Sequence, residues 1–114
     1  MASRLTMDSR LLVHSFDYSE YTGRDRYNQP TYAAKQTINN CRIDNTLVYA
    51  RDGVTTTVTA TAIIFCYAGL TSPWKDFKEQ SKVEFQGKSS IINRVVPVSH
   101  IDSSDLFAYE LEVV

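Results

Sequence analysis

One short segment near the C-terminus combines a histidine with carboxylates, the side-chain types that acid–base catalysis requires. His100 is followed there by Asp102 and Asp105, in the sequence SHIDSSD. A histidine or a carboxylate within hydrogen-bonding distance of a substrate can transfer a proton to or from it. Serine and aspartate are also ordinary turn residues, and the chain contains no Walker loop and no GxGxxG, HExxH or CxxC motif. We therefore expect a turn at this segment and a protein that is not an enzyme.

The two cysteines and the two histidines are the remaining candidates for metal or redox chemistry. His14 and His100 do not stand at a metal-ligand spacing from Cys41 or Cys66. We find no signal-peptide pattern and no apolar run long enough to span a membrane. The expectation is a chain assembled inside a cell, with reduced, buried cysteines and with no metal, cofactor or membrane partner.

Basic and aromatic side chains stand close together in the segment Ser19–Pro30, SEYTGRDRYNQP. Arg24 and Arg26 are suited to contact phosphate groups, and Tyr21 and Tyr27 are suited to stack on bases or to lie in a partner interface. Two acidic residues in the segment offset this charge, and the net charge of the chain is -1, which gives no general attraction for nucleic acid. The Gly, Asn and Pro residues of this segment predict a loop. The alternatives are therefore a solvated loop and a contact with nucleic acid or a partner.

The dominant element of the chain is the stretch Val54–Tyr67, VTTTVTATAIIFCY, which has no charge and no proline. Its β-branched and aromatic residues predict a strand. Threonines alternate with small apolar residues up to Thr61, as on a sheet with one wet face, whereas both faces are apolar from Ala62 onward. At about 3.3 Å per residue the stretch would span ~46 Å, far more than the ~14 Å radius of gyration expected of such a domain. The threonine half should therefore bend sharply or project as an arm.

The dipeptide Asp52-Gly53, which precedes this strand, predicts a two-residue type I′ hairpin turn. Such a turn pairs Arg51 with Val54 and, farther along the hairpin, Cys41 with Ile64, so that one face is almost continuously apolar. A slip by one residue would destroy that segregation. The hairpin either folds over its own core or reaches outside it.

A short helix is expected after this strand. Ser72 followed by Pro73 is a favourable helix opening, and Trp74 and Phe77 stand at i and i+3 on one side. One or two helical turns would fit this pattern. Trp74, with Phe77 beside it, then either plugs an open barrel end or anchors a neighbouring subunit, since tryptophan is over-represented in interface hot spots.

Alternating apolar residues predict further strands at residues 11–18, 82–85, 89–98 and 106–114. In the last of these, Phe107, Tyr109 and Leu111 are expected to face the core. The chain is therefore predicted to be all-β, with about six mainly antiparallel strands in a small barrel or sandwich, a long hairpin arm and at most one short helix. Its length allows a single domain, residues 11–114, after a flexible tail of residues 1–10.

Three blocks of the sequence resemble the phage minor capsid family of head-tail connector proteins. They are RIDNTLVYARDG with AIIFCYAGLTSP, then KVEFQGKSSIINRVVPV, and finally FAYELEVV, so that the resemblance covers roughly residues 11–114. Members of the family resemble head-completion, or stopper, proteins of long-tailed phages. The resemblance implies a small β-barrel that forms a homo-oligomeric ring, hexameric or dodecameric, at the head-tail junction of a virion assembled in the bacterial cytoplasm.

The resemblance also implies partners and a site. The ring would lie below the portal-adaptor protein, retain packaged DNA in its channel and offer a docking surface to a tail protein. The loop between the second and third family strands closes the channel in stopper proteins. In this chain it corresponds to Asn45, Thr46, Leu47, Val48, Tyr49, Ala50, Arg51, Asp52, Gly53, Val54 and Thr55. The alternatives are a nucleic-acid-binding barrel of the OB type, whose binding would weaken steeply with salt, and a tail-completion or terminator ring.

Overall fold

Six antiparallel strands form a closed barrel in the computed structural model, which describes residues 9–100 and 105–114. The order around the barrel is β1-β4-β7-β10-β9-β8. The barrel strands are β1 His14–Ser19, β4 Gln36–Asp44, β7 Ala62–Tyr67, β8 Lys82–Phe85, β9 Lys88–Ser99 and β10 Leu106–Val113. The prediction of a small all-β barrel of about six strands is confirmed, and closure pairs every barrel strand on both sides.

The barrel interior is filled by one apolar cluster to which all six barrel strands contribute. On β7, Ile64 and Cys66 are fully buried in this cluster, while the alternate residues Phe65 and Tyr67 belong to the other face. A second, smaller cluster covers that outer face, where Leu12 packs with Tyr67 and Ala108. The apolar half of the long stretch is thus buried on both faces, as its composition predicts.

The prediction for the face of β10 is only partly right. Leu111 is 0% exposed in the central cluster. Tyr109 is only partly buried at the edge of that cluster, and Phe107 packs in the second cluster instead. The pairing of β10 with β9 shifts register between Leu106 and Ala108, so the strict alternation that the prediction assumed is interrupted there.

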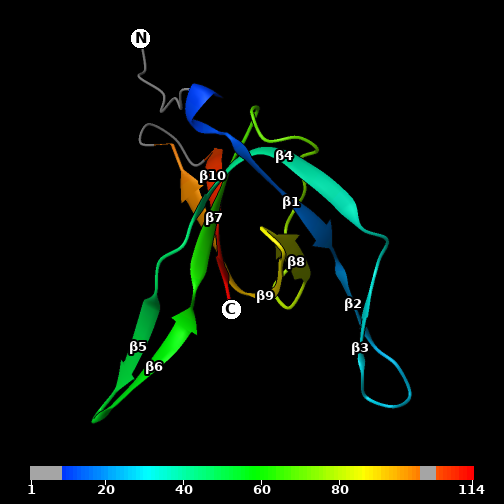
Figure 1. The fold of residues 1–114 in the computed structure, drawn as a ribbon, viewed down its shortest axis with the longest axis vertical. Helices are drawn as coiled ribbons and strands as arrows, with labels where there is room; N and C mark the ends of the chain where they lie inside the picture. Colours follow the sequence, from blue (N-terminus) through cyan, green and yellow to red (C-terminus); the bar gives the residue numbers. More distant parts are fainter. Residues whose placement is uncertain (1–8, 101–104) are drawn as a thin grey trace.

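Two hairpins project from opposite sides of the barrel and lean toward the same end, as Figure 1 shows. One pairs β5 Val48–Asp52 with β6 Thr55–Ala60, and the other pairs β2 Tyr21–Arg24 with β3 Pro30–Tyr32. We call them the β5–β6 arm and the β2–β3 arm. The molecule measures 54 × 40 × 27 Å with a radius of gyration of 15.4 Å, above the ~14 Å of a compact domain, because both arms lie outside the barrel.

The long stretch bends where its composition changes. Strand β6 ends at Ala60 and β7 begins at Ala62, with Thr61 between them. Thr61 remains tied to the barrel, since its backbone N–H donates to the carbonyl of Val113 at 2.8 Å. The expected bend is therefore present, and the threonine half leaves the barrel as an arm.

The predicted register of the hairpin is wrong by two residues. Asp52 pairs with Thr55, so the turn is Gly53-Val54 and not Asp52-Gly53. Gly53, with φ of 61°, takes the first turn position, where a type II′ turn requires glycine. Ile43, and not Cys41, therefore lies opposite Ile64. Because a shift by two residues keeps every side chain on its face, the predicted segregation of apolar and polar residues survives.

Half of the loop predicted over Ser19–Pro30 is strand. Residues 21–24 and 30–32 pair, and only residues 25–29 form the connecting turn. Two cross-strand contacts hold this pair. The Tyr21 and Tyr32 rings meet edge to face with centroids 6.4 Å apart, and the Thr22 and Thr31 hydroxyls lie 2.8 Å apart. Such pairs stabilise a sheet despite the poor strand propensity of Gly and Pro.

The helix predicted after Ser72 is absent from the described residues, whose one helical element is the 3₁₀ turn η1 Ser9–Leu11. Ser72 instead forms a β-bridge. Its backbone N–H donates to the Asn39 carbonyl at 3.1 Å, and its carbonyl accepts from the Asn39 N–H at 2.7 Å. The Ser72 carbonyl, which a helix would need as its first acceptor, is therefore already bonded.

The second predicted hairpin is formed by β8 and β9, joined at Gln86-Gly87. Pro97 lies in the part of β9 that extends beyond β8 and pairs only with β10, where a missing donor is tolerated. Most of the predicted N-terminal tail lies outside the described residues. Within the described part of the chain, no helix combines the length and apolar character needed to cross a membrane.

Candidate functional site

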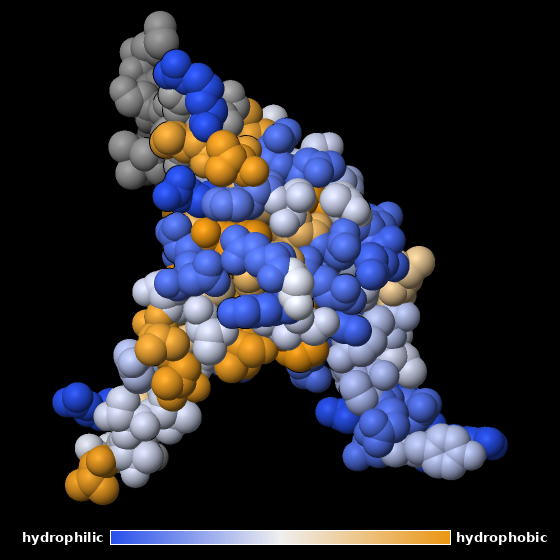
Figure 2. Space-filling model, in the orientation of Figure 1, coloured by the Kyte–Doolittle hydropathy of each residue, from blue (hydrophilic) through white to orange (hydrophobic). Residues whose placement is uncertain are grey.

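The β5–β6 arm exposes an unusual amount of apolar surface for two short strands. Leu47 is 53% exposed, Tyr49 56%, Val58 41% and Val54, at the turn, fully exposed. Tyr49 and Val58 pair directly, so their side chains share one face, while the next pair, Ala50 and Thr57, lies on the other. Figure 2 shows apolar atoms along this arm and at its end. A single subunit therefore leaves this face uncovered.

The arm is fixed to the barrel only at its base. The Asn93 side-chain amide donates to the carbonyl of Thr59 at 2.9 Å, and the Thr59 hydroxyl donates to the Val48 carbonyl at 3.2 Å. From this clamp to the tip, the described side chains at positions 49–51 and 53–58 are all exposed, whereas Ala60 at the base is buried. The predicted closing-loop residues 45–55 thus form the approach from the barrel, strand β5 and the turn of the projecting hairpin, whose second strand is β6.

The tip of the β2–β3 arm is an ordered polar turn. One carboxylate oxygen of Asp25 accepts hydrogen bonds from the backbone N–H groups of Tyr27 at 2.8 Å and Gln29 at 3.0 Å. The Arg24 guanidinium donates to the Asn28 carbonyl at 2.9 Å. The Arg26 guanidinium lies over the Tyr27 ring, 4.9 Å from its centroid. The predicted residues Arg24, Arg26 and Tyr27 are therefore brought together at this tip, where Figure 2 shows a hydrophilic surface.

Tyr21 lies at the base of this arm and not at its tip. Its backbone N–H donates to the hydroxyl of the fully buried Ser81 at 3.0 Å. The Tyr18 hydroxyl shares a hydrogen bond with that oxygen at 3.3 Å and accepts one from the Lys78 N–H at 3.0 Å. A buried polar network therefore fixes the direction in which the arm leaves the barrel.

Trp74 and Phe77 lie together in the connection between β7 and β8. Phe77 is buried in the central cluster, edge to face with Tyr18 at 5.1 Å. Trp74 is partly buried, edge to face with Phe77 at 6.1 Å and stacked on Tyr109 at 5.5 Å. Phe77 is therefore a core residue, and Trp74 packs against the core with part of its ring exposed. The part of Trp74 that stays exposed is the part available for a neighbouring subunit.

Cys41 and Cys66 are free thiols in the core, as predicted. Burial raises the pKa of Cys41 from 9.0 to about 12 against the opposing effect of a backbone hydrogen bond. Burial also raises the pKa of Cys66, and the neighbouring Cys41 adds to the increase. Because the thiolate is the reactive form, both side chains behave as small apolar core residues.

The histidines take part in packing and backbone contacts. His14 Nδ1 accepts a hydrogen bond from the Ile43 N–H at 3.1 Å. The His100 ring rests edge to face on Phe107 at 5.2 Å, and the His100 N–H donates to the Asp105 carbonyl at 3.0 Å. Asp102, the third residue of the predicted acid–base group, lies outside the described residues. Residues 9–100 and 105–114 contain no group of three or more His, Cys, Asp or Glu side chains placed to hold a metal ion.

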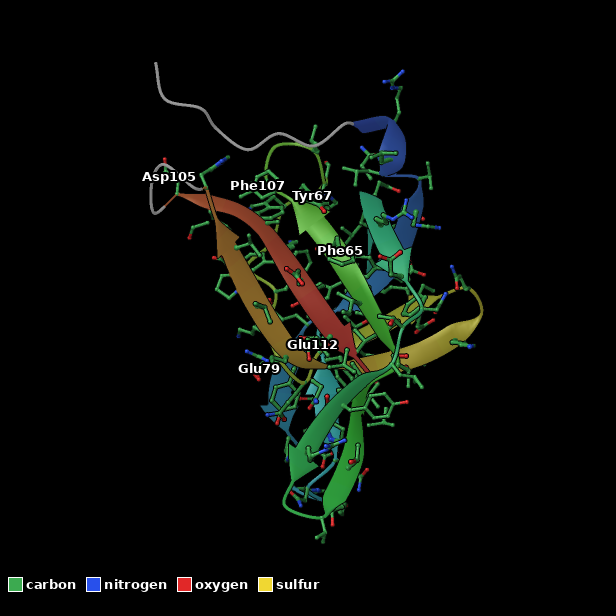
Figure 3. All side chains as sticks on the ribbon, turned by 90° about the vertical axis from the view of Figure 1, so that its left-hand side faces the viewer. Phe65, Tyr67, Glu79, Asp105, Phe107 and Glu112 are labelled. Atoms are coloured by element: carbon green, nitrogen blue, oxygen red, sulfur yellow. The ribbon has the colours of Figure 1, made fainter. Side chains whose placement is uncertain are left out.

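Sequence reasoning missed a groove at the base of the β5–β6 arm. It has a volume of about 480 Å³ and lies between the arm and the barrel. Glu79, Arg94 and Glu112 contribute its charged side chains, and Figure 3 shows Glu79 and Glu112 near each other above the arm. The two glutamates are 33 residues apart in the sequence, so only the closed barrel brings them to one site. The one feature of the sequence that pointed to this groove was the outward position of Glu112 in the last predicted strand.

The fold and these two arms define a small antiparallel barrel whose most exposed features are hairpins suited to contact other molecules. A family model described as "Minor capsid protein" matches residues 8–113. The chain therefore belongs to this family of phage minor capsid proteins, and it is a structural protein of the virion. No curated protein and no solved structure matches it.

Proposed function

We propose that this minor capsid protein is the head-completion, or stopper, protein of a phage head-tail connector. Its subunits form a ring, hexameric or dodecameric, below the portal-adaptor protein. The ring retains packaged DNA and docks the tail protein, and the β5–β6 arm closes the channel. Assembly takes place in the cytoplasm of the bacterial host. The observation that supports this proposal is the uncovered apolar face of that arm.

The physical argument starts from the marginal stability of an isolated hairpin. A two-stranded hairpin is barely stable in water unless it packs against another element. The face of Tyr49 and Val58 is solvent-exposed in the single subunit, and both outer edges of the arm are unpaired. In a ring, arms that converge on the axis would cover these faces and edges with copies of themselves. Assembly would then create a plug that the free subunit lacks.

A nucleic-acid-binding barrel is the alternative that one specific observation favours. Arg24, Arg26 and Tyr27 form a compact basic and aromatic tip, a combination that suits single-stranded nucleic acid. Its affinity for an oligonucleotide would fall steeply as salt rises, whereas a stopper needs only weak contact with DNA in its channel. A tail-completion ring would differ in its partner, so pull-downs with portal-adaptor and tail components separate it from a stopper.

The proposal is tested by removing the arm in a phage that lacks its own copy of the gene. Residues 48–55 are deleted and bridged with glycines, and tail-less heads are assayed for retained DNA. We expect a folded barrel, incorporation into heads and leakage of DNA. A milder pair compares Y49S/V58S with T55A/T57A, which alters the opposite face of the same arm outside the groove at its base. Only the first variant should leak.

Two results would contradict the proposal. Unfolding of the deletion variant would mean that residues 48–55 support the core. Heads that contain the variant and still keep their DNA would mean that another element closes the channel.

A further inference from the structure

We infer that the tip of the β2–β3 arm of one subunit docks into the groove at the base of the β5–β6 arm of the next subunit. The inference rests on the proposed ring and specifies which two surfaces meet in it. It assigns a role to the basic, aromatic tip and to the groove, to which the proposed function gives none. The partner is a second copy of this chain.

The positions of the two surfaces permit a head-to-tail contact. The two arms leave opposite sides of the barrel, as Figure 1 shows. The groove is lined by residues of the β5–β6 arm and the barrel, so it is a different surface from the tip of the β2–β3 arm. A contact between two different surfaces of identical subunits is heterologous, and it closes into a ring when the rotation between neighbours allows. An isologous contact, in which each surface meets itself, would stop at a dimer.

The charges of the two surfaces are complementary. The tip carries Arg24 and Arg26 against Asp25, whose carboxylate already accepts two backbone hydrogen bonds. The groove carries Glu79 and Glu112 against one arginine, Arg94, which lies 3.9 Å from Glu112. An excess of positive charge therefore faces an excess of negative charge. Opposite charges across an interface favour the correct register between partners.

The shapes and the polarity of the two surfaces also agree. Tyr27 is 69% exposed at the tip and is held in place by the cation–π contact with Arg26. The groove offers Val48 and Ala50 on its arm side, beside its acidic residues. An aromatic ring paired with a guanidinium group fits such a mixed apolar and acidic site, and tyrosine and arginine are enriched in interface hot spots. The ordered turn lowers the entropic cost of docking.

The docking has a direct consequence for the closing arm. Val48, Tyr49 and Ala50 belong both to the groove and to the β5–β6 arm. A neighbour seated in the groove would therefore hold the base of that arm. Subunit contact on the outside of the ring would set the direction of the arm toward its axis.

The test uses disulfide crosslinking of subunits with new cysteines. The double variant Y27C/E79C is oxidised both in purified heads and as concentrated purified protein. A heterologous contact links each subunit to two neighbours, so we expect a ladder of covalent multimers on a non-reducing gel. An equal mixture of Y27C and E79C should yield only dimers. Cys41 and Cys66 are buried and do not interfere.

A matched control places the second cysteine at an exposed position of β9 far from the groove. Y27C/S99C should remain monomeric. A charge-swap pair adds a second measurement. It concerns the size of the assembled species formed without crosslinking. R26E should form no species larger than a monomer, and R26E/E79R should form them again.

The outcomes separate the inference from the proposed function. Absence of the protein from heads contradicts the proposed function, while the ladder of the purified protein still tests the contact. Monomers in both preparations would overturn the inference. A tip that binds DNA instead would leave monomers and give salt-sensitive binding of an oligonucleotide that R24S/R26S abolishes, which would also overturn it.

Discussion

The Trp74 and Tyr109 rings are stacked against the central apolar cluster, with centroids 5.5 Å apart and planes inclined by 15°. The Tyr109 hydroxyl donates to Asp76 at 3.3 Å, so the segment that bears Trp74 is tied to β10 twice. Burial first, and the nearby Asp76 second, raise the pKa of Tyr109 above 10.0. This contact joins the long β7–β8 connection to the core.

Replacement of Trp74 by alanine should lower the free energy of unfolding by about 2 to 3 kcal/mol. Truncation of a fully buried aromatic residue to alanine costs roughly 3 to 5 kcal/mol. The loss expected here is smaller because Trp74 is only partly buried. Trp74→Phe keeps the stacking and should cost less. Denaturant unfolding followed by circular dichroism measures both changes. An unchanged midpoint for Trp74→Ala would show that the residue serves partners only.

Truncation of Leu111 should be far more damaging than a charge change beside it. Leu111 is fully buried, so Leu111→Ala should cost about 2 to 5 kcal/mol. Glu110→Lys, on the opposite face of β10, is the matched control and should change stability by less than about 1 kcal/mol. Phe107→Ala should fall between them because Phe107 is only partly buried. Equal losses from Leu111→Ala and Glu110→Lys would mean that the faces of β10 are assigned wrongly.

Stability should be constant at neutral pH and fall above pH 9. The pKa of the Cys41 thiol rises from 9.0 when unfolded to about 12 when folded, and the pKa of Cys66 rises in the same direction. Above pH 9 the unfolded chain loses these protons first, so the folded state becomes progressively less favoured until the pH passes about 12. Unfolding curves between pH 7 and pH 11 measure the trend. The variant C41A/C66A should show a weaker fall, and an equal fall would assign the effect to other groups.

The same burial predicts slow thiol chemistry. Native protein at pH 8 should react very slowly with a thiol reagent, whereas denatured protein should yield two free thiols. Mild reductant should leave the melting temperature unchanged. Fewer than two thiols after denaturation would contradict the free state of these cysteines.

Replacement of Asp25 by alanine should loosen the tip of the β2–β3 arm without unfolding the barrel. The substitution removes the acceptor of the Tyr27 and Gln29 N–H groups. Faster hydrogen exchange at these two amides, with a loss of global stability below about 1 kcal/mol, is the expected result. Asp25→Asn keeps an acceptor oxygen and should exchange more slowly than Asp25→Ala. Unchanged exchange in Asp25→Ala would mean that the turn is held by its backbone alone.

Much of the fold was predictable because strong local patterns agree with tertiary burial. The stretch Val54–Tyr67 changes from a one-sided to a two-sided apolar pattern at Thr61, and the chain bends there. The exact register was less accessible, since Gly53 suits either position of a primed turn and both choices segregate the faces equally well. The β2–β3 arm was hidden because its strands are short and contain Gly and Pro, and cross-strand pairs hold it together.

One part of the candidate site was also predictable from the sequence, and the other part was not. The β5–β6 arm follows from local sequence, because its length and threonine content place it outside the core. The groove does not, because Glu79 and Glu112 meet only after the barrel has closed. The bridge between Ser72 and Asn39 is likewise a long-range contact that overrides a favourable local helix signal.

The pairing of β1 with β8 has a consequence for how the chain folds. β1 is near the start of the sequence, but its second neighbour does not exist until residues 82–85 have been synthesised. Each arm, in contrast, joins strands that are adjacent in the sequence, and such hairpins form within about 1–10 µs. Non-local strand pairing is slow, so closure of the barrel should limit the folding rate. The hairpins of the two arms can then form transiently before the barrel closes, whereas the groove that receives a neighbour exists only once the barrel is complete.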